Sequence, residues 1–267
     1  MSNPVRPPVA AYWNLPEGYF CTNYRDPSFP APLTLSGING SLQANSNENG
    51  CLVSACGGLK VEEIGSVVGV QSPTGTLEAW VWFDEEDPRP AAEAPLISRM
   101  DKWGFELRAS TVEQSMVMKN PGLMSKAKEA TVRCKLEPKK WHHICGTFGP
   151  FGVCIHVNGA QKEGFFTNKH MDSGLHIETT KPTVTITIGT NFVKPKKGKE
   201  HIFKGRVKLA RIAMEELYYT EQIVDLLPSM NPVSIIASPL KWHRPVTQTF
   251  EQYKVSCGTQ FISDLSG

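Results

Sequence analysis

The sequence lacks long hydrophobic runs, and its opening stretch lacks the apolar core of a secretory signal. No apolar run approaches the roughly 20 residues that a membrane-spanning helix needs. The opening residues, MSNPVRPPVAAYWNLPEG, carry early prolines where a signal peptide has its apolar segment. These absences predict an intracellular protein, cytoplasmic or cytoskeletal, that does not insert into a membrane.

Cysteine pairs of the kind that bind metals are also absent. The seven cysteines are an odd number without a C-x-x-C pair, which favours reduced thiols over a disulfide framework. Cys145 and Cys154 flank a turn, so one disulfide between them stays open as an alternative for an exported protein. The adjacent His142 and His143 do not predict a zinc site, because neighbouring residues of a strand point to opposite faces.

The sequence shows no catalytic arrangement. A glycosidase needs two carboxylates that reach the sugar from the same side. Residues 84–87, DEED, are instead contiguous in a proline-rich stretch and predict a solvated acidic loop. No Ser/His/Asp or Cys/His signature occurs. We therefore expect a protein that is not an enzyme and needs no cofactor.

Short alternating segments separated by turn residues are the main feature that is present. Residues 139–159, KKWHHICGTFGPFGVCIHVNG, predict a β-hairpin with strands Trp141–Phe148 and Val153–Val157, in which Trp141 anchors the core. One late helix is predicted at 220–227, where Pro228 ends it. Further strands are predicted at Thr76–Asp84, Pro95–Met100, Trp103–Ser110, Val112–Val117, Thr131–Leu136, Pro182–Gly189 and Phe203–Met214.

Both ends of the chain are rich in proline and in aromatic or apolar residues. Proline excludes regular helix and central strand, whereas a disordered tail normally lacks aromatic side chains. We therefore expect residues 1–35 and 228–267 to be extended arms on either side of one domain, residues 36–227. The arms dock either on this domain or on a partner.

A series of motifs runs in order through residues 50–227: Gly75–Val81, Pro95–Arg99, Trp103–Arg108, Trp141–Phe148, His156–Gly159, Ile186–Gly189, Phe203–Val207 and Leu217–Leu227. This series resembles the laminin-G-like, or concanavalin A-like, superfamily. The resemblance implies an all-β fold, a two-sheet antiparallel jelly-roll sandwich with one short C-terminal helix. Proteins of this fold include lectins, glycosidases, adhesion modules and structural interaction modules, so the fold leaves the function open.

The resemblance also points to candidate ligand residues. Trp103, Glu106 and Arg108 match the W-G-x-E-x-R sugar-binding strand of galectins, although the galectin H-x-N-P-R strand has no counterpart upstream. Family members bind calcium at the rim through Asp and Asn side chains. Calcium is kept as an alternative only, because the candidates form no ligand series in the sequence: Asp101, Asn158, Asp172 and Asn191.

Positive charge clusters late in the chain, with Glu200 as the single acid among it. Arg206 and Lys208 alternate with Val207 and Leu209, so both are expected to point away from the core. A face of one sign suits a polyanionic partner such as acidic protein tails, RNA or a sulfated glycan, and an ordinary solvated face is the alternative. The predicted basic face consists of Lys194, Lys196, Lys197, Lys199, Lys204, Arg206, Lys208 and Arg211.

These observations favour two hypotheses over a third, an enzyme of the glycosidase type, which would need two close carboxylates in a cleft. The first is a non-enzymatic interaction module, docked through its arms and the basic face in a larger intracellular assembly of ciliary, cytoskeletal or ribonucleoprotein type. The second is a carbohydrate-binding module, with or without calcium. The sequence identifies neither the partner nor the ligand.

Overall fold

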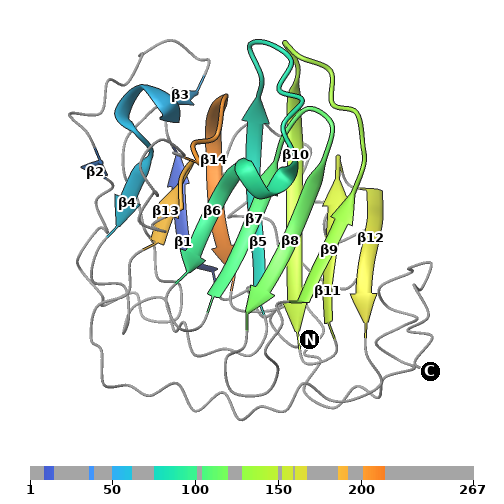
Figure 1. The fold of residues 1–267 in the computed structure, drawn as a ribbon. Helices are drawn as coiled ribbons and strands as arrows, with labels where there is room; N and C mark the ends of the chain where they lie inside the picture. Colours follow the sequence, from blue (N-terminus) through green and yellow to red (C-terminus); the bar gives the residue numbers. More distant parts are fainter. Residues whose placement is uncertain are drawn as a thin grey trace, which may run out of the picture.

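The computed structural model is an all-β structure built from two antiparallel sheets, as the sequence predicts (Figure 1). The predicted helix at 220–227, the arm 228–267 and Trp103 lie outside the described residues. The structure describes residues 9–14, 36–38, 50–61, 75–100, 104–119, 128–149, 152–158, 160–166, 186–191 and 201–213.

The first sheet contains the predicted central hairpin. The short strand β3 (Cys51–Leu52) also belongs to this sheet and pairs only with β14 among the described strands. The main order of strands is β1 (Val9–Asn14), β14 (Arg206–Ala213), β5 (Gly75–Trp82), β10 (Trp141–Gly149), β11 (Gly152–Val157) and β12 (Ala160–Phe166).

The second sheet lies in front of the first in Figure 1, with β8 and β9 packed over β11. Two 3-10 helices, η1 (Val53–Cys56) and η2 (Ala91–Glu93), lie between its strands in the sequence. The order in the sheet is β2 (Ser36–Gly37), β4 (Leu59–Val61), β13 (Ile186–Ile188), β6 (Pro95–Met100), β7 (Gly104–Ala109), β8 (Gln114–Lys119) and β9 (Lys128–Val132).

One hydrophobic core fills the space between the sheets. Alternation along β5 places Leu77, Ala79 and Val81 on the inner face, as predicted, and all three are fully buried. Leu107 and Met116 face them from the second sheet. The two inner faces interdigitate, as in other sandwiches, and this burial is the main stabilising term of the fold.

The β10–β11 hairpin is confirmed, but Trp141 does not anchor the core. The register pairs Phe148 with Val153 and Gly149 with Gly152 at the tight end of the hairpin. Ile144 and Phe148 point into the core, so the odd-numbered Trp141 lies on the outer face of the sheet and is only half-buried. The core function expected for Trp141 was therefore wrong.

Part of the predicted N-terminal arm is a strand of the sandwich. β1 pairs with β14 at the edge of the first sheet, and its sequence VAAYWN lies between Pro8 and Pro16. Proline is compatible with strand ends and edge strands, which explains why this proline-free stretch pairs here. The arms were expected to dock either on the chain's own domain or on a partner. Val9–Asn14 docks on the chain's own domain.

Gly189 directly follows β13 and provides a test of packing at the end of this strand. Its φ of +76° is unfavourable for other residues, and an added Cβ would lie 2.5 Å from Cγ2 of the buried Val53. We expect Gly189→Ala to lower the free energy of unfolding by about 2–3 kcal/mol in urea titrations. A loss under about 0.5 kcal/mol would contradict this packing.

Candidate functional site

Two tryptophans and three charged residues gather at one end of the first sheet, on its outer face. The register places Trp82 opposite Trp141 on β10 and opposite Arg206 on β14. Asp84 follows β5, and Lys208 belongs to β14. We call these five residues the tryptophan edge.

The geometry of the tryptophan edge is held by one carboxylate. The indole Nε1 of Trp82 donates a hydrogen bond to Asp84 Oδ1 at 3.2 Å, and Arg206 Nε donates to the same oxygen at 3.1 Å. The two indole rings are 5.7 Å apart and tilted by 56°, and Lys208 Nζ lies 5.9 Å from the centre of the Trp141 ring. Arg206 is 23% exposed and Asp84 47%, so the edge is open to a ligand.

Two backbone features set this arrangement, and neither is visible in the sequence. The β14–β5 register shifts between Val207 and Leu209, so Lys208 is an extra residue in β14. Gly50 has a φ of +73°, and an added Cβ would lie 2.8 Å from Trp141 Cη2. Its lack of a side chain therefore leaves room for the Trp141 ring.

The structure divides the predicted basic face. Lys204 is exposed, whereas Arg206 pairs with Asp84 and Lys208 packs against Trp141. Arg211 is 1% exposed and pairs with Glu78, so it is no part of a solvent-facing surface. The four lysines between 194 and 199 lie outside the described residues: Lys194, Lys196, Lys197 and Lys199.

Arg211 belongs instead to a buried polar row on the outer face of the first sheet. Its guanidinium contacts Glu78 on β5, and His143 Nε2 on β10 lies 3.3 Å from the other carboxylate oxygen. Burial raises the pKa of Glu78, but the charge of Arg211 and the hydrogen bond with His143 outweigh it and hold the pKa below its usual value. Burial lowers the pKa of the adjacent His156 to about 3.

The two hairpin cysteines extend this row and do not face each other. Cys145 lies opposite His156, and Cys154 lies opposite Thr147, so the cysteines are offset by two residues. The disulfide alternative is therefore wrong for this structure. Burial, together with the charge of Glu78, raises the pKa of the Cys145 thiol, and this makes it a poor nucleophile.

The galectin-like pair on β7 is engaged within the chain. Glu106 is fully buried; its Oε2 lies 2.7 Å from Arg108 Nη2, and its Oε1 accepts a hydrogen bond from Asn191 Nδ2 at 3.2 Å. Arg108 also contacts Glu129 at 3.3 Å. Sugar binding by this pair remains a prediction, and in this arrangement neither side chain points its charge at solvent.

The two calcium candidates that the structure describes, Asn158 and Asn191, each bond a different partner. Asn191 bonds Glu106, and Asn158 accepts a hydrogen bond from the backbone N–H of His143 at 2.9 Å. Asp101 and Asp172 lie outside the described residues. Within the described part of the chain, no three His, Cys, Asp or Glu side chains are grouped so that they could hold a metal ion.

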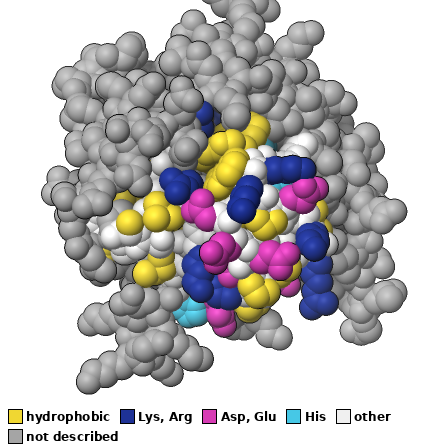
Figure 2. Space-filling model, turned by 90° about the horizontal axis from the view of Figure 1, so that it is seen from above, with side chains coloured by type: hydrophobic (Ala, Val, Ile, Leu, Met, Phe, Trp, Pro, Cys, Tyr) yellow, Lys and Arg dark blue, Asp and Glu magenta, His cyan; other side chains and the backbone are white. Residues whose placement is uncertain are grey.

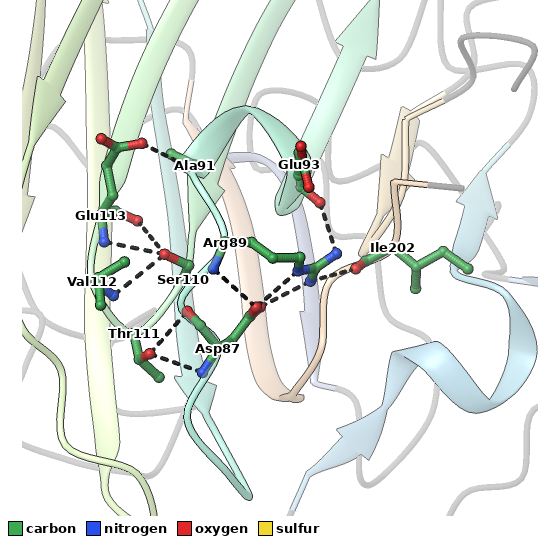
Figure 3. Close-up of polar contacts among 9 residues, drawn as sticks. All are labelled: Asp87, Arg89, Ala91, Glu93, Ser110, Thr111, Val112, Glu113 and Ile202. Carbon is green, nitrogen blue, oxygen red and sulfur yellow. Dashed lines mark hydrogen bonds and ion pairs between the residues drawn. The ribbon is translucent and has the colours of Figure 1, made fainter. Parts of the chain in front are cut away.

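The acidic loop after β5 is only partly solvated. Figure 3 shows Asp87 pointing toward Arg89. The side chain of Asp87 is 3% exposed and pairs with Arg89 at 2.8 Å. Thr111 Oγ1 bonds both backbone groups of Asp87, and Arg89 Nη2 donates to the carbonyl of Ile202 at 2.9 Å. The expectation of a solvated loop holds for residues 84–86 and is wrong for Asp87, whose charge is paired internally.

The end of the sandwich has a mixed charge. Figure 2 looks down on it and shows positive and negative side chains interspersed among the coloured residues. Exposed charged residues of the described part of the chain include Glu93, Arg133 and Lys135. None of the helices that the structure describes has the length and apolar character of a membrane-spanning segment.

Known structures share this fold. The chain matches domain 4 of AbnA, a GH43 extracellular arabinanase from Geobacillus stearothermophilus in complex with arabinotriose, at 14% identity and a TM-score of 0.53, over 84% of this chain and 100% of that one. The fold is a two-sheet antiparallel jelly-roll sandwich. The predicted fold class is thereby confirmed, and at this identity the likeness concerns the fold alone.

Two further matches have lower TM-scores. The native heptameric SAP-like pentraxin of Limulus polyphemus matches at 13% identity and a TM-score of 0.39, over 59% of this chain and 70% of that one. Domains LG4-5 of the mouse laminin alpha1 chain match at 13% identity and 0.38, over 53% and 35%. No family model and no curated protein matches the sequence.

The Glu78–Arg211 pair allows a double-mutant test. Glu78→Leu or Arg211→Met alone leaves one buried charge without its partner, so each is expected to lower the free energy of unfolding by about 3–5 kcal/mol. The double variant removes both charges and should recover most of this loss. Urea unfolding of the four proteins measures the coupling, and simply additive losses would contradict it.

His156 predicts acid sensitivity of the fold. Its pKa is about 3 in the folded protein against an ordinary value of 6.5, so between these pH values the unfolded chain binds more protons. The free energy of unfolding should fall by about 1.4 kcal/mol per pH unit as pH drops below 6.5, and the lowered pKa of Glu78 acts in the same direction at lower pH. Urea titrations at pH 7, 6 and 5 should show a smaller fall in His156→Gln, and equal slopes would refute the assignment.

Proposed function

We propose that this chain is a non-enzymatic binding module that docks on a protein partner within a larger assembly. The tryptophan edge carries this proposal. Trp82 and Trp141 are half-buried beside Arg206, and tryptophan and arginine are enriched among the residues that dominate binding energy at protein interfaces. Asp84 fixes both Trp82 and Arg206, so less side-chain entropy is lost on binding.

The tryptophan edge replaces part of the surface that the sequence suggested. Val9–Asn14 is already paired with β14, so this part of the N-terminal arm is not available to a partner. The proposal keeps residues 228–267 and the lysines at 194–199 as additional contacts, with an intracellular, cytoskeletal or ciliary assembly as the setting. An open aromatic surface of this kind is what a rigid sandwich offers a partner.

Trp82→Ala tests the proposal against a matched control. Trp80→Ala removes another half-buried indole from the same strand, two residues away. In extracts of the source cells, the wild-type chain should elute from a sizing column far above its 29.5 kDa, and Trp82→Ala should elute as the free chain. Loss of a hot-spot residue weakens binding by about 2 kcal/mol or more. Elution of the wild type as a free monomer would overturn the proposal.

Carbohydrate binding is the second candidate. The matching arabinanase domain is in complex with arabinotriose, and half-exposed tryptophans beside Asp84 and Arg206 offer a stacking surface with polar neighbours. A glycan array with and without calcium decides this candidate. Binding that Trp82→Ala abolishes supports it, and the absence of any glycan signal removes it.

A further inference from the structure

The residues around the tryptophan edge carry more positive than negative charge. Lys139 and Lys140 directly precede Trp141, and Lys204 precedes Arg206. Asp84 is bound to Arg206, and Glu137 is bound to Lys140. Lys139, Lys204 and Lys208 make no ion pair with a described residue, so the described part of the chain leaves these three positive charges uncompensated.

The continuation of the acidic loop does not cancel this excess. Glu86 lies 3.9 Å from Lys135, which follows β9 of the second sheet. Asp87 is turned inward toward Arg89. Glu85 is the remaining exposed carboxylate of the loop, and even when it is counted, positive charges outnumber negative ones. Such a local field attracts anionic partners and raises their rate of association.

The arrangement of the aromatic rings limits the type of anion. The Trp82 and Trp141 rings are tilted by 56°, and Lys208 lies over the Trp141 ring. This leaves no flat platform for the stacked bases of a single-stranded nucleic acid. The angle between the rings instead forms an apolar corner that suits one aliphatic side chain, with Lys208 beside it.

The size of the surface suits a short extended peptide. Arg206, Trp82 and Trp141 occupy three neighbouring strands in one row. Neighbouring strands are about 4.8 Å apart, so the row spans on the order of 10 Å. An extended chain covers this distance with about three residues.

We propose that the tryptophan edge binds an acidic peptide segment of a protein partner, in which one apolar side chain enters the corner between Trp82 and Trp141. Carboxylates of the segment pair with Lys204 and Lys208. This inference rests on the proposed function and specifies the partner's chemistry. Of the predicted basic face, the proposed site uses Lys204, Arg206 and Lys208. Arg211 is excluded, because it is buried against Glu78.

The experiment uses the full chain and a labelled peptide of glutamates around one central leucine. A second peptide carries glutamine in place of every glutamate. Fluorescence anisotropy should show binding of the acidic peptide with a dissociation constant below about 100 µM that weakens with added salt, because exposed charges are screened. The glutamine peptide should bind at least about tenfold more weakly. Equal binding of the two peptides would overturn recognition by charge.

Charge-reversal variants locate the site. Lys208→Glu and Lys204→Glu should each weaken the acidic peptide about tenfold. Lys204 is exposed, so its variant tests the site even if Lys208→Glu disturbs the Trp141 packing. The matched control is Arg133→Glu at a side chain that is 91% exposed, just after β9 in the other sheet. An equal loss in Arg133→Glu would overturn the placement.

Competing polyanions complete the test. Single-stranded RNA and a sulfated oligosaccharide are titrated against the same variants. If either polyanion binds more tightly than the acidic peptide and is weakened equally by Lys208→Glu, the proposal of an acidic peptide ligand is overturned in favour of that polyanion. Failure of the acidic peptide alone leaves the proposed function standing if Trp82→Ala still releases the chain from its assembly, so the two failures are distinguishable.

Discussion

The buried pair of Glu78 and Arg211 constrains the arrangement of the first sheet. A carboxylate and a guanidinium that are both almost fully buried must lie opposite each other, because either charge alone would be costly. The bulge after Val207 makes this possible, since it shifts the rest of β14 by one residue relative to β5. The register of β14, which also pairs with β1, therefore depends on the contact between Glu78 and Arg211.

The tryptophan edge depends on the same register. Because Arg206 precedes the bulge, it lies opposite Trp82 and reaches Asp84, while the bulge residue Lys208 reaches the Trp141 ring. The tryptophan edge and the buried polar row thus occupy one sheet face and share strands β5, β10 and β14. The loop after β5 adds rigidity, since Asp87 is held by Arg89 and Thr111.

The fold was largely predictable because period-two alternation and turn residues are local signals. β6 has the predicted bounds, and β5, β7, β10 and β11 agree within about two residues. β9 begins three residues before the predicted strand at 131–136, because its polar sequence alternates weakly. β1 was missed as a strand, since flanking prolines give no sign of which edge a short segment will pair with.

The sequence by itself determined the alternation of core residues, the hairpin and the class of fold, because each depends on neighbouring residues. The tertiary structure alone decided which charges are paired and which are exposed. Arg211 and Lys204 look alike as members of one basic cluster, yet one is buried against Glu78 and the other faces solvent. Their difference arises from contacts between strands far apart in the chain and from the bulge in β14, which no residue type predicts. A pattern along one strand cannot contain that information, because it exists only once the partner strands are in register.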